Sequence, residues 1–155
     1  MRRIFALILS VVAFQQSAHP ENSVIVGHGI SSDEVPSLGS VDDWNVFFLW
    51  TLDAKRTVSG PKVTGRVRAL NIAHAGAMPK FVRSVELFVL SPITVGTAEV
   101  HNTGANYWIV ALSPRHKGSM YCTSQDPHDV GILIDRSQIT LDEHGAFCFK
   151  KVLLK

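Results

Sequence analysis

Apolar and polar residues alternate with a period of two along much of this chain, which is the pattern of β-strands and not of amphipathic helices. The clearest case is the segment 62–69. Its outer row consists of Lys62, Thr64, Arg66 and Arg68, and its inner row of Val63, Gly65, Val67 and Ala69. Because the inner row contains a glycine, we expect a bulge or a sharp bend at Gly65.

A second strand is expected at Trp44–Leu52, which is rich in aromatic and apolar residues on both alternating faces. This composition predicts a strand that is buried on both faces, Trp44 included. Further strand-like segments, rich in β-branched and aromatic residues, are 81–90, 106–112, 120–122, 130–134 and 146–154.

Glycine or proline stands at most turns between these segments, and no long amphipathic helix is indicated. Short strands at such spacing, separated by Gly and Pro turns, are typical of antiparallel sandwiches and barrels. We therefore expect a mainly β protein, either a small antiparallel β-barrel of OB-like type or a β-sandwich. The glycine within a long alternating strand favours the barrel.

The N-terminus has the order of a secretory signal peptide. Arg2 and Arg3 precede the apolar run Ile4–Phe14, and the small residue Ala18 follows shortly after it. The run is shorter than the roughly 20 residues that a membrane-spanning helix needs. We expect residues 1–18 to be a cleaved signal peptide, with no integral membrane span in the remaining chain, and the mature protein to be secreted or periplasmic.

The segment that follows the leader differs in composition from the rest of the chain. Residues 19–40 are rich in Ser, Gly, Pro and acidic residues, apart from Val24–Val26. This composition predicts an irregular N-terminal segment with at most one short edge strand. Residues 41–155 are then expected to form a single β domain.

The net charge changes once the leader is removed. The chain has 15 Lys and Arg against 13 Asp and Glu, and residues 1–18 contain two arginines and no acidic residue, so 13 of each sign remain. A neutral protein has no overall field that attracts nucleic acid or an anionic membrane. The composition therefore argues against nucleic acid as a partner, and any attraction to anions must come from a local patch.

Cys122 and Cys148 are the two cysteines of the chain. In an exported protein such a pair is expected to form a disulfide. On the chain-entropy model a ring of this size stabilises the fold by about 3 to 4 kcal/mol. The alternative, a reactive or metal-binding pair, lacks the Cys-x-x-Cys spacing of such sites.

No catalytic or metal site is indicated by the spacing of the polar residues. The seven histidines contain neither His-x-His nor His-x-x-x-His, and most of them fall in or beside expected turns. The best fragments of a site are His128-Asp129 and Asp142-Glu143-His144. The Gly-x-Ser-x-Gly signature of serine hydrolases is absent. We therefore predict no catalytic residues, metal or cofactor.

The candidate binding residues are Lys62, Arg66, Arg68 and Trp108. The three cations project from one face of one strand, although they could equally be its ordinary solvent face. Trp108 could be an exposed ring that stacks on a sugar. These features favour an extracytoplasmic binding or accessory domain that recognises an envelope protein or an anionic glycan. The alternatives are a small hydrolase that uses loop His and Asp residues, and a subunit of a larger envelope assembly.

Overall fold

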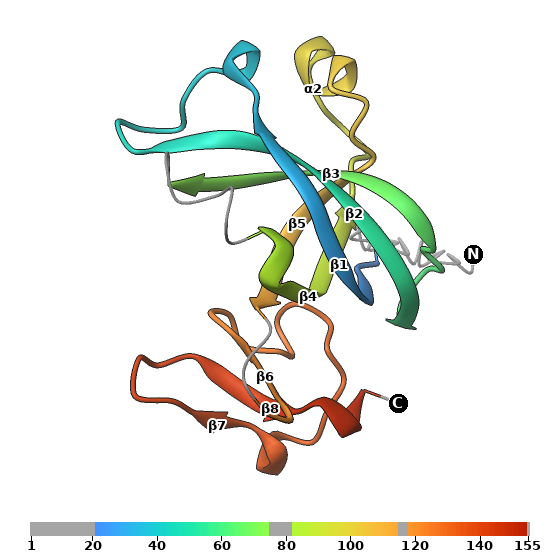
Figure 1. Cartoon of the computed structure of the whole chain (residues 1–155), viewed down its shortest axis with the longest axis vertical. Coiled ribbons are helices and arrows are strands. Elements are labelled where there is room, and N and C mark those ends of the chain that lie inside the picture. The colour runs from blue at the N-terminus through green and yellow to red at the C-terminus, as the bar shows by residue number, and fades with distance from the viewer. Residues whose placement is uncertain (1–20, 75–81, 115–117, 155) are drawn as a thin grey trace, which may run out of the picture.

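The structure is a computed structural model that describes residues 21–74, 82–114 and 118–154. Eight strands and a short helix are labelled in Figure 1. The strands are β1 (Ser23–Glu34), β2 (Asn45–Ser59), β3 (Gly65–His74), β4 (Val85–Pro92), β5 (Tyr107–Pro114), β6 (Met120–Thr123), β7 (Thr140–Leu141) and β8 (Phe147–Lys150). The helix α2 covers Ala98–Asn102, and 3-10 turns cover Pro36–Leu38, Val82–Ser84, Arg136–Gln138 and Lys151–Leu153.

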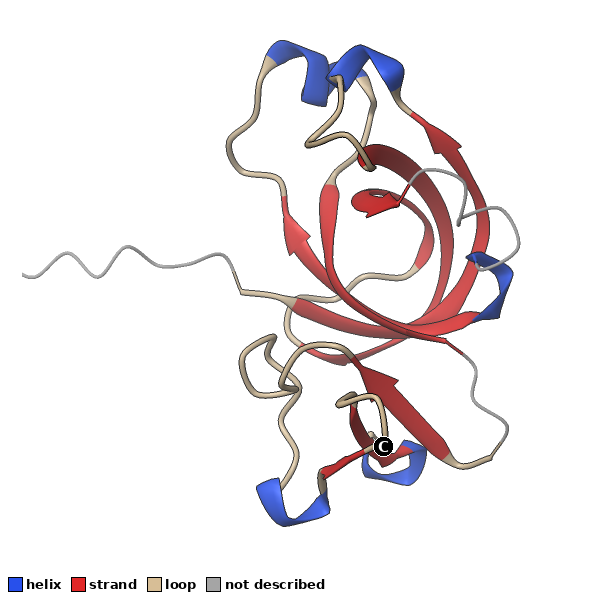
Figure 2. Cartoon of the chain, turned by 90° about the vertical axis from the view of Figure 1, so that its left-hand side faces the viewer, coloured by secondary structure: helices blue, strands red, loops and turns tan. Residues whose placement is uncertain are grey.

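The first five strands form a closed barrel in the order β1-β2-β3-β5-β4. Figure 2 shows this barrel nearly end-on. All of its neighbouring strands are antiparallel except β3 and β5, which run parallel and pair at Ala69↔Tyr107 and Leu70↔Trp108. A five-stranded barrel of this kind is the architecture of OB-folds. The mainly β prediction is confirmed, and of the two expected architectures the structure has the barrel.

The N-terminal segment differs from the prediction, because Ser23–Glu34 is a 12-residue strand of the barrel. β1 pairs with β2 along its length and with β4 over its first four residues. The expectation of an irregular segment was wrong here because Gly27 and Gly29 allow close approach. A Cβ atom at Gly27 would lie 2.3 Å from the backbone oxygen of Asp53, and one at Gly29 would lie 2.3 Å from that of Val82.

The barrel interior is filled by apolar side chains from all five strands. Trp50 is fully buried, and its ring meets the ring of Phe88 edge-on with centroids 6.1 Å apart. On β2 the inner row contains Phe48, Trp50 and Leu52, whereas Phe47 and Leu49 are only partly buried. The prediction of a strand buried on both faces is therefore wrong.

Trp44 also differs from the prediction, since it is 67% exposed. It precedes the first residue of β2, Asn45, and its ring stacks on that of His74 with centroids 5.8 Å apart. The aromatic run of the sequence thus extends one residue beyond the strand that it forms.

A second layer, formed by the sheet β6-β8-β7, lies below the barrel in Figure 1. Its side chains pack with residues of β1, β4 and β5 in a second apolar core that includes Val24, Leu87, Val89, Tyr121 and Phe149. The three barrel strands therefore contribute apolar side chains to two cores, one inside the barrel and one outside it.

The expected strand at 130–134 is not formed, because these residues are turn and coil. Val130 and Ile132 are nonetheless buried in the second core, which accounts for their apolar character. β7 was not predicted, and the last strand ends at Lys150, where a 3-10 turn replaces its expected continuation.

The predicted signal peptide, residues 1–18, lies outside the described residues. Among the residues that are described, no helix has the length and apolar character needed to cross a membrane.

Candidate anion-binding site

The alternation predicted for the segment 62–69 is found in the structure. Val63, Val67 and Ala69 are buried, whereas Lys62, Arg66 and Arg68 are exposed. Lys62 differs from the prediction in one respect, since it lies in the loop that precedes β3. Gly65, expected on the inner row, is exposed and has a φ of 80°, a left-handed conformation that favours glycine.

The three predicted cations do not form one row on the surface. Arg68 lines a hollow beside α2 that also contains Asp33, Glu34 and Glu99. Its surroundings are therefore acidic, and an anionic ligand would meet carboxylates there. Lys62 and Arg66 lie near other basic side chains instead.

Arg66 belongs to a row of charged residues that crosses three strands. His28 on β1 is paired in register with Asp53 on β2, and Asp53 is paired with Arg66 on β3. The His28 Nε2 atom is 3.7 Å from Asp53 Oδ2, and Lys55 donates a hydrogen bond of 2.5 Å to the same oxygen. One carboxylate is thus surrounded by three basic side chains.

This arrangement stabilises the charged form of Asp53. The hydrogen bond from Lys55 lowers the pKa of the Asp53 carboxyl, and electrostatic interactions with Lys55, His28 and Arg66 lower it further. Asp53 is therefore ionised at neutral pH. It holds the basic side chains in place but cannot neutralise all of them.

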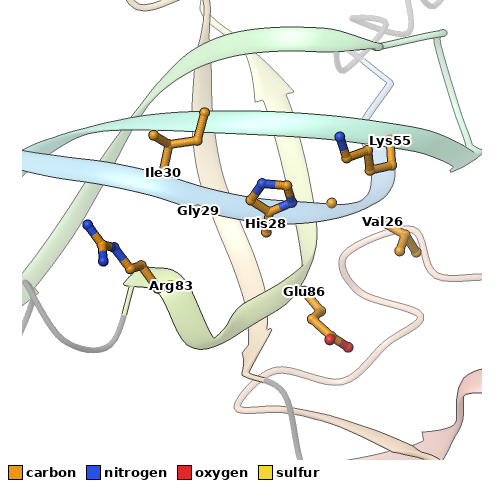
Figure 3. Close-up of a pocket in the computed structure, with 8 residues that line it drawn as sticks. Val26, His28, Gly29, Ile30, Lys55, Arg83 and Glu86 are labelled. Atoms are coloured by element: carbon orange, nitrogen blue, oxygen red, sulfur yellow. The ribbon is translucent and has the colours of Figure 1, made fainter.

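A hollow of about 660 Å³ adjoins this row along β1 (Figure 3). His28 and Lys55 contribute to its lining, and Arg83 joins them from the 3-10 turn Val82–Ser84. Glu86 also lines the hollow, but its carboxylate accepts a hydrogen bond of 2.8 Å from Lys151. The charge of Glu86 is therefore compensated, and the hollow keeps a positive balance.

A second hollow, of about 420 Å³, shares the lining residue Lys55 with the first. It is lined by Lys55, Arg56 and Lys62 and contains no acidic residue. Arg56 donates a hydrogen bond of 2.9 Å to the backbone oxygen of Leu154, so its guanidinium is held by the C-terminal segment. We use the name basic face for the surface formed by His28, Lys55, Lys62, Arg66 and Arg83.

Trp108, the fourth predicted binding residue, does not lie on the basic face. It is half-buried, and its ring centroid is 6.2 Å from that of Phe47. It lines two hollows beside β5 that contain neither lysine nor arginine. The structure thus separates an aromatic groove from the basic surface.

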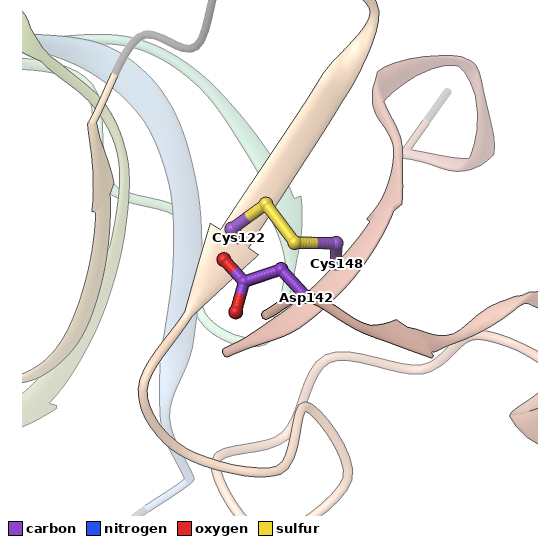
Figure 4. A group of neighbouring side chains, drawn as sticks. All are labelled: Cys122, Asp142 and Cys148. Carbon is purple, nitrogen blue, oxygen red and sulfur yellow. A yellow bond between two sulfur atoms is a disulfide. The ribbon is translucent and has the colours of Figure 1, made fainter. Parts of the chain in front are cut away.

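The predicted disulfide is present between Cys122 and Cys148. The carboxylate of Asp142 lies close to both sulfur atoms (Figure 4). Since the sulfurs are bonded to each other, they offer no thiolate to a metal. Asp142 Oδ1 instead accepts hydrogen bonds from the backbone amides of His144 and Ala146, at 2.9 and 2.8 Å. Asp142 therefore stabilises the turn between β7 and β8 and is not a metal ligand together with the cysteines.

The histidine fragment around His128 also has a structural role. The backbone amide of His128 donates to Asp126 Oδ1 at 2.9 Å, and its Nε2 atom lies 2.5 Å from the backbone oxygen of Ile134. These contacts tie the ends of one loop together.

Sequence reasoning missed His28, Lys55 and Arg83 as members of the basic face. His28 was expected in a turn, whereas it lies in the middle of β1. Lys55 and Arg83 lie outside the alternating segment 62–69. Lys55 approaches Arg66 through the pairing of β2 with β3, and Arg83 joins Lys55 only as a lining residue of the first hollow. Recognising β1 as a strand would have been the first step towards finding the site.

Comparisons of the chain with protein-family models, with curated proteins and with solved structures give no match.

Proposed function

We propose that this protein is an exported binding domain whose basic face recognises an anionic glycan. The observation that carries the proposal is the surplus of basic side chains around the single carboxylate of Asp53. The disulfide supports the export, since disulfides persist in oxidising compartments outside the cytoplasm, and the signal peptide predicted at residues 1–18 agrees with it.

The arrangement of the cations favours a chain of anionic groups over a single small anion. Basic side chains line two hollows that share Lys55, and these side chains are exposed. Each exposed contact contributes little alone and is screened by salt. A glycan with repeated carboxylate or sulfate groups engages several of them at once, so the contributions accumulate along the surface.

The proposal is tested by titration calorimetry with two anionic glycans, heparin and alginate, at about 50 mM salt, where exposed charges are weakly screened. In the test variant Lys55, Lys62 and Arg66 are replaced by Ser. We expect it to bind at least about tenfold more weakly than the wild type, and the wild type to weaken as salt rises.

A matched control separates a specific surface from net charge. Arg68, Arg136 and Lys150 are described cations outside the basic face, and replacing all three by Ser changes the net charge equally. The control should bind as the wild type does. An equal loss of binding in both triple variants, or no binding of either glycan to the wild type, would contradict the proposal.

A small hydrolase stays the alternative, and the feature that favours it is the contact of Asp53 with His28, which lines the first hollow. Release of new reducing ends from the same two glycans measures this activity. If such release were lost in His28→Ala while affinity persisted, the hydrolase would replace the binding domain as the better description.

A further inference from the structure

The barrel is closed by a short pairing at one seam, between β3 and β5. These strands pair at Ala69↔Tyr107 and Leu70↔Trp108, and no further pair joins their described residues. β3 nevertheless continues to His74 in register with β2, and β5 continues to Pro114 in register with β4. Beyond the two pairs, the described part of the chain pairs each of these strands on its other edge only.

The hollow in this seam is lined by the edges of both strands. It measures about 390 Å³, and its walls include the consecutive residues 71–73 of β3 and 108–112 of β5. Successive side chains of a strand point to opposite faces. A strand that lines a hollow with every residue must therefore face it with its hydrogen-bonding edge.

The part of β5 that borders the seam has none of the residue types that usually protect an edge strand. Tyr107–Leu112 contains no charged residue and no proline. Natural sheets discourage pairing at their edges with lysine, proline or a covering element. An uncharged stretch of high β-propensity at an open edge favours the addition of another strand.

The rest of the wall provides side-chain contacts on both sides of the seam. Ile72 is 47% exposed, Trp108 is half-buried, and Gln125 reaches the hollow from the loop after β6. An adjoining hollow of about 700 Å³ shares these three residues and extends to Asn22 and Asp129. The groove thus offers apolar surface beside amide and carboxylate groups.

We propose that the seam binds an extended polypeptide segment of a partner protein, which adds as a strand between β3 and β5. Its main-chain groups hydrogen-bond to the edges of Asn71–His74 and Ile109–Leu112, and its alternate side chains contact Trp108 and Ile72. This site is separate from the basic face and does not depend on the proposed glycan. It gives the barrel a second ligand class, recognised by backbone geometry.

The experiment uses the whole protein and a phage-displayed library of random dodecapeptides as the probe. Enriched peptides are synthesised, and their affinity is measured by fluorescence polarisation. Each is then compared with an analogue that has identical side chains and alternate N-methylated amides. We expect N-methylation to weaken binding at least tenfold, because it removes donors needed for a β-ladder. We also expect a bound peptide to slow hydrogen exchange at residues 71–74 and 109–112.

A variant of the protein tests the same edge from the other side. Val110 is skipped in the register of β5 with β4, where Leu90 pairs with Ile109 and Val89 with Ala111. Proline is tolerated at such bulges. Val110→Pro should therefore keep the fold, as checked by its melting curve, and lose peptide binding. If it does not fold, the N-methylated peptides still decide the question on the wild type.

The triple Ser variant of the basic face should bind the selected peptides as the wild type does. The proposal is overturned if the library yields no binder, if N-methylation leaves affinity unchanged, or if exchange slows elsewhere. It is also overturned if a neutral oligosaccharide such as cellohexaose slows exchange at these amides and peptides do not. That result would assign the groove to sugar stacking on Trp108.

Discussion

Cys122 lies directly opposite Cys148 in the register of β6 and β8, and their Cα atoms are 4.1 Å apart. The disulfide therefore joins two strands at a point where they are already neighbours. The sheet that it crosslinks is small, because β8 pairs at four positions with β6 and at two with β7. The bond holds the sheet itself together, and the sheet is joined to the outer side of the barrel by apolar packing of Tyr121 and Phe149 in the second core.

Replacing Cys148 by Ser should destabilise the protein by about 3 kcal/mol, because the crosslink closes a ring over a separation of 26 residues. Thermal unfolding measures the effect, with the reduced wild type as the matched control. The reduced wild type and the variant should melt at similar temperatures, several degrees below the oxidised protein. Equal melting of the oxidised wild type and the variant would refute a stabilising role for the bond.

Replacing a glycine of β1 by alanine, which adds one methyl group, should destabilise the fold. Gly27→Ala places a methyl group 2.3 Å from a backbone oxygen of β2, so a strand must move. We expect a loss of about 1 to 3 kcal/mol in the free energy of unfolding, measured by urea denaturation.

Gly65→Ala provides the comparison, since nothing lies within 4 Å of its added Cβ and only the left-handed φ of 80° opposes it. Its cost should be about 1 kcal/mol, the penalty of that conformation for a residue with a side chain. If Gly27→Ala were as stable as the wild type, the close contact between β1 and β2 would be incorrect.

The barrel core should depend strongly on Phe88. Its side chain is fully buried and packs edge-on against Trp50, so Phe88→Ala leaves a cavity beside the largest side chain of the core. We expect a loss of about 3 to 5 kcal/mol. Denaturant unfolding followed by tryptophan fluorescence measures it, and a cost below about 1 kcal/mol would mean that this ring is not enclosed.

Removing the carboxylate of Asp53 should strengthen the binding of anions. Asp53→Asn keeps the shape of the side chain and leaves Lys55 and Arg66 without their negative partner. Affinity for heparin should therefore rise at low salt, as measured by calorimetry. A decrease would place the glycan away from this row of residues.

The same variant gives a pH test. The pKa of Asp53 is lowered in the folded protein, first by the hydrogen bond from Lys55. Its ionised form therefore stabilises the fold above the pKa of the unfolded chain, and this contribution is lost as the pH falls through the lower folded-state pKa. The acid-side decline of the melting temperature should be shallower in Asp53→Asn than in the wild type, and identical profiles would contradict the shift.

The sequence predicted those parts of the fold in which a local residue pattern has a single structural explanation. The alternation at 62–69 follows from a strand with one buried face, and the cysteine pair follows from its composition and the leader. β1 was missed because its central glycines resemble a turn, and their real cause is the approach of Asp53 and Val82 from distant parts of the chain.

The same reasoning explains the errors at 130–134 and at the candidate site. Val130 and Ile132 are apolar because a second layer covers them, although their backbone is not extended. The basic face was only partly predictable, because His28, Lys55 and Arg66 become neighbours through the register of three strands. A sequence shows which face of one strand is polar, but not which polar faces lie side by side.

The pairing of β1 with β4 joins distant parts of the chain. Val24 pairs with Val89, so the strand that is synthesised first cannot complete its ladder until most of the barrel sequence is available. Such long-range pairing slows folding relative to proteins with local contacts. Both cysteines lie beyond β5, in the small outer sheet. The barrel is therefore closed by strand pairing alone, and the covalent crosslink belongs to the layer that covers its outer side.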